Sequence, residues 1–240
     1  EAHPKSYLND ENRARLTGLL ESGDAAALRF RNMVDSEVEG TDHYGFEPWF
    51  AALMGQLSGD PKYCALAVSR TEDWVTGEEA LIAAGQRAEV AGDSYLEVGG
   101  HIGSLAMTFD WCYGSLSASQ RTRWINYANQ AVWNVWNHQD ATWGGVAYPW
   151  SGWSVDNPSN NYYYSFLRAT MLLGLATEQE NSLAAGWLTK FRQEKIGMQL
   201  IPTFNNDLGA ARYNKAAADL AWGRTVAFFK ETLGVPPSAA

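Results

Sequence analysis

The amino-acid sequence predicts an all-α protein, and three observations support this fold class. Apolar residues recur at helical spacing along most of the chain, as in Trp49, Phe50, Leu53, Met54 and Leu57. Ser, Asp and Asn residues precede such segments, where their side chains can cap a helix. No segment sustains the polar–apolar alternation that is typical of a strand.

The elements follow one another as short helices with clear boundaries. Asn9 or Asp10 can cap the first helix, and residues 23–24 end it and start the second. A loop follows at residues 40–45, and residues 117–120 form a capping box before a later helix. Helices are expected through residues 13–20, 28–34, 49–57, 61–74, 78–93, 95–113, 124–135, 162–176, 183–200 and 216–233.

A faint internal repeat indicates how these helices are arranged. Residues 54–65 and 173–184 each combine an apolar helix end, a short polar turn and an Ala-containing second helix. Repeated helical hairpins of this kind predict an incomplete α/α toroid. An ordinary antiparallel helical bundle uses the same turns and stays an alternative.

Charge and hydropathy exclude two classes of partner. The net charge of −9 argues against nucleic acid, because neutralising phosphates requires clustered Lys and Arg. No apolar run is long enough to span a bilayer, so no membrane partner is expected. Cys64 and Cys112 both lie in apolar helical stretches; two buried thiols are expected, and one disulfide is the alternative.

The aromatic content points to a saccharide ligand. The chain has 11 Trp, 11 Tyr and 9 Phe, with many of them near its middle. Residues 138–159 form a long loop rich in Trp, Gly and Pro, and such loops are more often functional than idle. Its stacking candidates for sugar rings are Trp143, Tyr148, Trp150 and Trp153, although core packing explains about half of them. The expected partner is a polysaccharide or oligosaccharide.

Two segments carry a resemblance to a known family. Residues 3–16 (HPKSYLNDENRARL) and 153–164 (WSVDNPSNNYYY) resemble the α/α-toroid polysaccharide lyases, the heparinase II/III-like and alginate-lyase-like group. The resemblance covers about residues 1–207. It implies β-elimination at uronic-acid units: an Asn neutralises the carboxylate, a Tyr or His removes the adjacent proton, and a Tyr protonates the leaving oxygen.

The resemblance assigns roles to the start of one expected helix. Asn161 matches the carboxylate-neutralising Asn, and Asn160 is the neighbouring candidate for substrate binding. Tyr162 or Tyr163 stands where the family places an aromatic residue or His. One Asn can instead cap the helix, and the consecutive tyrosines cannot all face one way, so at least one is expected in the core.

His101 is the further candidate for proton transfer. Glu97 lies four residues earlier, so the pair shares a helix face, and a buried hydrogen-bonded pair is the alternative. Arg168 is a candidate for substrate binding and could lower the pKa of a Tyr in the same cleft; a surface Arg is the alternative. The four His show no His-x-x-x-His spacing, so no metal or cofactor is part of the leading prediction.

The end of the chain resembles a different family. Residues 211–230 (ARYNKAAADLAWGRTVAFFK) are similar to the last helix of the dienelactone hydrolases. In that family a catalytic His lies just upstream of this helix. Residues 202–204 (PTF) stand in its place here, so the His is missing, and no nucleophile elbow occurs elsewhere. The prediction is therefore a truncated toroid-like domain over residues 1–207, followed by an atypical C-terminal helix and tail over residues 208–240.

These observations lead to one function with two alternatives. The leading prediction is a carbohydrate-active protein that resembles polysaccharide lyases. The alternatives are a non-catalytic glycan-binding remnant and a small-ester hydrolase that uses a Glu/His or metal cluster around His101. A secreted or periplasmic location is expected. A homodimer is expected too, because a partial toroid leaves helix faces uncovered.

Overall fold

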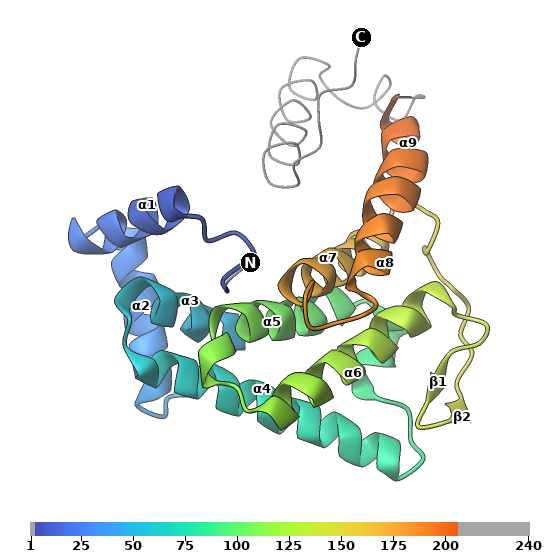
Figure 1. Ribbon diagram of the computed structural model, residues 1–240, viewed down its shortest axis with the longest axis horizontal. Coiled ribbons are helices and arrows are strands. Elements are labelled where there is room, and N and C mark those ends of the chain that lie inside the picture. The colour runs from blue at the N-terminus through green and yellow to red at the C-terminus, as the bar shows by residue number, and fades with distance from the viewer. Residues whose placement is uncertain (1–2, 206–240) are drawn as a thin grey trace. The chain divides into compact units, whose positions relative to one another are not determined.

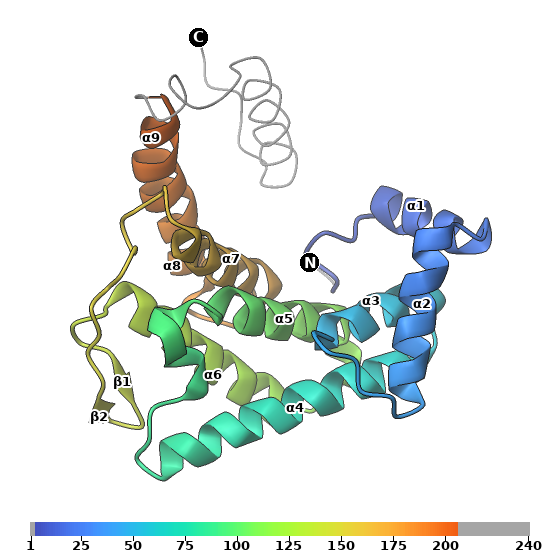
Figure 2. The same cartoon turned by 180° about the vertical axis from the view of Figure 1, so that it is seen from behind.

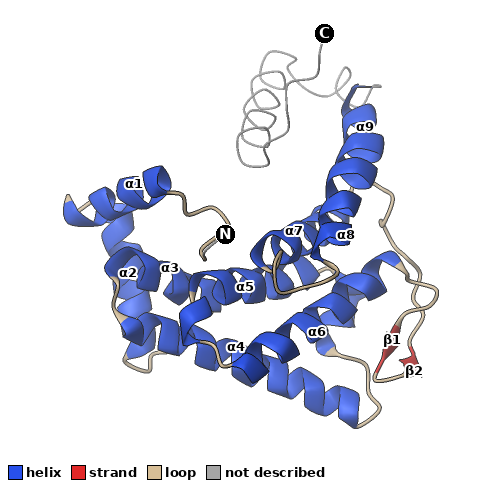
Figure 3. Ribbon diagram, viewed as in Figure 1, coloured by secondary structure: helices blue, strands red, loops and turns tan. Residues whose placement is uncertain are grey.

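The computed structural model describes residues 3–205 and confirms the all-α class. Figure 3 shows helices throughout this part of the chain, with one small pair of strands. The chain divides into two compact units, Glu1–Phe191 and Arg192–Ala240. The boundary predicted between residues 207 and 208 lies outside the described residues, as does the expected C-terminal helix.

The elements of the first unit are short to medium helices with two strands in one loop. In chain order they are α1 (Asp10–Glu21), α2 (Ala25–Val38), α3 (Pro48–Ser58), α4 (Pro61–Ala83), the 3₁₀ segment η1 (Glu89–Tyr95), α5 (Val98–Trp111), η2 (Tyr113–Ser115), α6 (Ala118–Trp136), β1 (Thr142–Trp143), β2 (Val146–Ala147), α7 (Asn161–Ala176) and α8 (Ala184–Thr189). A π-helical segment, η3 (Lys190–Leu200), and α9 (Ile201–Asn205) follow.

Helices α3 and α4, α5 and α6, and α7 and α8 form successive hairpins. Gly59 ends α3 with a φ of 72°, a left-handed conformation that glycine adopts without steric cost. Asp60 then caps α4 by accepting a hydrogen bond from the backbone N–H of Lys62 at 3.0 Å. Ser117 and Gln120 form the predicted capping box of α6.

Both segments of the internal repeat fall on such hairpin turns. Residues 54–65 contain the turn between α3 and α4, and residues 173–184 contain the turn between α7 and α8. The repeat therefore marks equivalent positions in the first and third hairpins of the described chain.

The first helices of the three hairpins lie side by side and run in the same direction (Figures 1 and 2). The backbone N–H of Trp49 at the start of α3 approaches the Ser104 hydroxyl in the middle of α5 at 3.4 Å. The backbone N–H of Gly99 donates to the Ser165 hydroxyl at 2.8 Å near the starts of α5 and α7. Parallel first helices are the unit of an α/α toroid, but they also fit an open stack of hairpins. The toroid stays a prediction.

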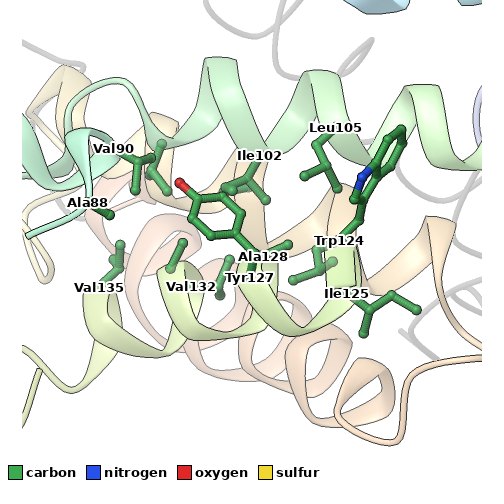
Figure 4. Packing of buried hydrophobic residues seen from close by; sticks show 14 of the residues in the cluster. Ala88, Val90, Ile102, Leu105, Trp124, Ile125, Tyr127, Ala128, Val132 and Val135 are labelled. Carbon is green, nitrogen blue, oxygen red and sulfur yellow. The ribbon is translucent and has the colours of Figure 1, made fainter. Parts of the chain in front are cut away.

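The larger core cluster joins α5 to α6 and α7. Figure 4 shows Ile102 and Leu105 of α5 facing Trp124, Tyr127 and Ala128 of α6, and all of them are buried. Aromatic rings of this size bury more apolar area than any other side chain. The core therefore fixes α5, the central helix of the parallel row.

Cys64 and Cys112 form a disulfide, so the expected pair of free buried thiols is wrong and the alternative holds. The bond joins the first turn of α4 to the residue that follows α5. It lies in a second core cluster with Met54, Met107 and Trp111. No helix of the described residues is both long and apolar enough to cross a membrane.

Candidate functional site

The two asparagines at the start of α7 have different environments. Asn160 is the N-cap residue, and its side-chain oxygen accepts a hydrogen bond from the backbone N–H of Tyr162 at 3.0 Å. Asn161 is the first helical residue, and its side chain is exposed. The structure thus assigns the capping role to Asn160 and leaves Asn161 facing solvent.

Asn160→Ala is expected to lower the free energy of unfolding by about 1 kcal/mol, because the variant loses this cap. Asn161→Ala is the matched control and should change the same quantity by less than about 0.5 kcal/mol, as an exposed substitution. Urea unfolding of both variants measures the difference. Equal losses in the two variants would contradict the assignment of the cap.

The three consecutive tyrosines of α7 separate into different environments. The Tyr162 hydroxyl donates to the Asp93 carboxylate at 2.9 Å, and this hydrogen bond raises the pKa of Tyr162. Tyr163 is fully buried, and burial raises the pKa of its hydroxyl. Tyr164 is exposed and donates to the Pro158 carbonyl at 2.8 Å. Of the two tyrosines predicted for proton transfer, Tyr162 can reach a ligand and Tyr163 cannot.

The partner of Tyr162 lies in an unusual backbone segment. Asp93, Ser94 and Tyr95 have φ values of 42°, 53° and 63°, all left-handed and none of them glycine. Such residues cost about 1–3 kcal/mol each and persist only where the surrounding structure holds them. Buried Glu78 holds the start of this segment, accepting a hydrogen bond from the backbone N–H of Glu89 at 3.1 Å. Sequence reasoning missed Asp93 because no local pattern marks this turn.

The aromatic loop is mostly packed inward, which corrects the expectation of an open stacking surface. Trp143 is only 1% exposed. The Tyr148 hydroxyl donates to the Gly85 carbonyl at 2.6 Å, and the Trp150 indole N–H donates to the Asn134 carbonyl at 2.9 Å. Both of these rings pack against the core.

Trp153 differs from the other three stacking candidates because it is 55% exposed. Its ring is the one member of the predicted set that presents a broad surface to solvent.

His101 lies on the side of α5 that faces α4, where its ring stacks on Trp74 with centroids 5.0 Å apart. The His101 side chain is exposed, so the alternative of a buried pair with Glu97 is wrong. The interaction recorded between these two residues is the helical backbone hydrogen bond at 3.0 Å. The described residues contain no group of three or more potential ligands that could hold a metal.

The Arg168 side chain packs against α5 on the side opposite His101. Its Nε lies close to Gly103, where an added Cβ would meet it at 3.0 Å. Residues two apart on a helix point about 200° apart, so Gly103 and His101 mark different sides of α5. The structure therefore does not bring His101 and Arg168 together.

Glu47, just before α3, is the ion-pair partner of Arg168. The guanidinium and carboxylate atoms lie 3.6 Å apart, and both side chains are half-exposed. The Trp49 indole N–H also donates to the Glu47 carboxylate. Sequence reasoning missed Glu47 and Trp49, because only the parallel packing of α3 beside α5 brings them near α7.

Asn161 and Arg168 are seven residues apart on α7, so they share a helix face two turns apart. We call the surface formed by exposed Asn161 and half-exposed Arg168 and Glu47, with partly buried Trp49 beside them and buried Gly103 beneath Arg168, the α3/α5/α7 surface. A guanidinium binds carboxylates through paired hydrogen bonds, and a primary amide supplies two further donors. The starts of α3 and α7 add the partial positive charge of helix N-termini. This surface can therefore bind a carboxylate beside a polar ligand.

The fold and this surface define an all-α protein of helical hairpins with a partly exposed, polar and aromatic surface over the start of α3, the middle of α5 and the first half of α7. No family model matches the chain, and no curated protein or solved structure matches it either. The function must therefore be argued from the residues themselves.

Proposed function

We propose that this protein is a carbohydrate-active, polysaccharide-lyase-like protein that performs β-elimination at uronic-acid units. The α3/α5/α7 surface is the proposed site. The observation that carries the proposal is the placement of exposed Asn161 and Arg168 on one face of α7, with the hydroxyl of Tyr162 beside Asn161 in sequence.

The residues suit the binding of a uronic-acid carboxylate. Arg168 can neutralise the carboxylate, and the Asn161 amide, two helical turns away, can donate a hydrogen bond to another oxygen of the bound ligand. Neutralising that carboxylate lowers the pKa of the adjacent C–H, which is the proton lost in β-elimination. The ion pair with Glu47 holds the Arg168 guanidinium near Gly103 in the ligand-free protein.

Tyr162 suits the second proton transfer of the reaction. The hydrogen bond to Asp93 raises the pKa of Tyr162, so its hydroxyl keeps its proton at neutral pH. A protonated phenol is a proton donor and a poor base. We therefore assign Tyr162 to protonation of the leaving oxygen, and we do not assign it to removal of the C–H proton.

Exposed aromatic rings supply the stacking part of the proposal. Trp153 and Tyr164 belong to the loop before α7 and to its first turn, and both are largely exposed. Their rings can stack on the apolar C–H face of a sugar. The same loop is anchored to the core by the buried ring of Trp143 and by the rings of Tyr148 and Trp150 that pack against it.

A panel of alginate, heparinoid and hyaluronan tests the proposal, with the ultraviolet absorbance of unsaturated uronides as the readout. The wild-type protein is expected to release such products from one polymer. Asn161→Ala should lower the rate about 100-fold or more, as expected for losing a donor to developing charge. Asn160→Ala is the matched control and should keep most of the activity. No absorbance from any polymer with the wild-type protein would overturn the proposal.

A non-catalytic glycan-binding role is the second candidate. The observation that favours it is that no candidate base among residues 3–205 is placed at the surface: His101 lies on the other side of α5, and Tyr162 holds its proton. Saccharide binding without any unsaturated product would support this role. The ester-hydrolase alternative gains no support from the position of His101.

The disulfide supports a secreted or periplasmic location as part of the proposal. Disulfides persist in oxidising compartments, whereas cytosolic thiols are usually kept reduced. The bond between Cys64 and Cys112 therefore fits a protein that meets extracellular polysaccharides.

A further inference from the structure

The end of α2 carries a serine and a glutamate that both contact one histidine. The Ser36 hydroxyl lies 3.3 Å from Nε2 of His43, and Nδ1 of the same ring lies 3.2 Å from the Glu37 carboxylate. A nucleophile, a base and a carboxylate that orients the base are the parts of a catalytic triad, which is recognised by geometry and not by sequence order. We call Ser36, Glu37 and His43 the α2 triad.

The turn after α2 brings His43 back to the end of that helix. Gly40 has a φ of 96°, a conformation that is open to glycine. The backbone N–H of Thr41 donates to the Ser36 carbonyl at 2.9 Å. The N–H of Gly40 donates to the Glu37 carbonyl at 3.1 Å, which completes the hydrogen bonds of a Schellman motif. The chain therefore reverses, and the His43 ring lies beside the last turn of α2.

Glu37 is held firmly enough to orient the His43 ring. It is only 2% exposed, and its carboxylate accepts hydrogen bonds from the His43 backbone N–H at 2.5 Å and from the Arg70 guanidinium of α4 at 3.1 Å. A carboxylate only accepts hydrogen bonds, so Nδ1 of His43 carries the hydrogen of their contact. In a neutral ring Nε2 is then the acceptor, and it faces Ser36.

The Ser36 hydroxyl and the His43 ring are placed for a proton transfer near solvent. The hydroxyl also lies 2.9 Å from the Met33 carbonyl, so rotation of its single O–H selects between that oxygen and Nε2 of His43. Ser36 is partly exposed, the His43 side chain is 35% exposed, and the adjacent Tyr44 is fully exposed. A substrate can therefore approach this end of α2 from solvent.

We propose that the α2 triad is a catalytic site that hydrolyses esters of short carboxylic acids, such as acetyl esters. Ser36 is the nucleophile, His43 is the general base, and Glu37 is the positioning residue of His43. Arg70 and Asp42 are the neighbouring side chains, and their charges suit a short acyl group better than a long apolar chain. None of the triad residues belongs to the α3/α5/α7 surface, so this inference is independent of the proposed function.

The reaction proceeds in two halves that need only the ester and water. The Ser36 oxygen forms a bond to the acyl carbon while its proton moves to Nε2 of His43. The bond to the leaving oxygen then breaks, and that oxygen takes the proton from His43. Water attacks the acyl-serine, again giving a proton to His43, and the proton returns to the Ser36 oxygen as the carboxylic acid is released.

A phosphonofluoridate tests the nucleophile in the wild-type protein. The Ser36 oxygen would bond to phosphorus as fluoride leaves, and mass spectrometry of peptides locates the adduct. Ser22 is the internal control, because its hydroxyl also donates to a carbonyl three residues earlier, Leu19 at 3.2 Å, but contacts no histidine. An adduct on Ser36 and none on Ser22 is expected. No adduct on Ser36, or equal labelling of both serines, would overturn the proposal.

Hydrolysis of p-nitrophenyl acetate tests the base, with the absorbance of p-nitrophenolate as the readout. Ser36→Ala and His43→Ala should each lower kcat about 100-fold or more. The double variant should lose nothing further, because the two residues act as a unit. Ser22→Ala is the matched control and should keep the wild-type rate. An unchanged kcat in either single variant would overturn the assignment, and the β-elimination proposal would stand unaffected.

Glu37→Gln tests the positioning role. An amide can donate a hydrogen to the His43 ring and so favours the wrong tautomer, which should lower kcat about 100-fold while KM stays unchanged. Glu37→Asp keeps the carboxylate and should recover part of this loss. Equal kcat values for the wild type and Glu37→Gln, or for the two Glu37 variants, would overturn the positioning role.

Discussion

Replacing Cys64 and Cys112 together by alanine is expected to lower the free energy of unfolding by about 4 kcal/mol. The disulfide closes a loop with a sequence separation of 48 residues. In the chain-entropy description, a cross-link of this span lowers the conformational entropy of the unfolded chain, which destabilises that state by about this amount. Alanine keeps the Cβ atoms and introduces no buried hydroxyl. Urea unfolding of the wild-type and double-variant proteins measures the change.

A reductant provides the control for this prediction. It should lower the urea midpoint of the wild-type protein to that of the double variant and leave the variant unchanged. Because the bond joins the start of α4 to the end of α5, its loss should loosen the second core cluster. Identical midpoints for the oxidised wild type and the variant would show that the bond contributes no stability.

Gly99→Ala is expected to destabilise the protein by about 3 kcal/mol, near the upper end for overpacking. An added Cβ would meet the Ser165 carbonyl oxygen at 2.6 Å and its Cα at 2.8 Å. These are backbone atoms of α7, so they cannot rotate away, and α5 and α7 would have to separate. The hydrogen bond from the Gly99 N–H to the Ser165 hydroxyl would weaken as well.

Gly77→Ala is the matched control for this variant. Gly77 lies in α4 with no atom within 4 Å of an added Cβ. Alanine is the better helix former, so this change should stabilise the protein by about 0.5–1 kcal/mol. Thermal unfolding followed by circular dichroism should therefore shift in opposite directions for the two variants. Equal shifts would show that close packing at Gly99 is not what sets its effect.

Local signals account for the part of the fold that the sequence could predict. Side-chain caps at Asp60, Ser117 and Asn160 mark helix starts, because each hydrogen bond joins residues only two or three apart. The hairpin turns at residues 54–65 and 173–184 can be predicted too, because each joins two helices that are consecutive in the chain. The exposed position of Asn161 follows once Asn160 is known to be the cap.

The candidate site was harder to predict because its contacts are distant in sequence. Glu47 meets Arg168 only through the packing of parallel helices, and Tyr162 meets Asp93 only where α7 lies beside η1. Helical spacing alone also could not show on which side of α5 His101 lies.

The aromatic loop shows a second limit of sequence reasoning. A high Trp content is typical of both a buried hydrophobic core and a ligand-binding surface, and composition does not distinguish the two. Tertiary contacts decide the matter residue by residue: Trp143 is sealed in the core, whereas Trp153 is largely exposed. The homodimer and the hydrolase-like C-terminal helix stay predictions.

The common direction of α3, α5 and α7 gives this part of the molecule an electrical polarity. The dipoles of these three neighbouring helices point the same way, although their hairpin partners α4, α6 and α8 run in the opposite direction and offset part of that field. Basic groups lie at the negative ends, where His3 pairs with Asp110 near the end of α5 and Lys5 pairs with Glu180 in the turn after α7. The opposite ends favour an incoming anion. An anion would thus meet a local partial positive charge at these helix starts, which the carboxylates of Glu47 and Glu97 oppose.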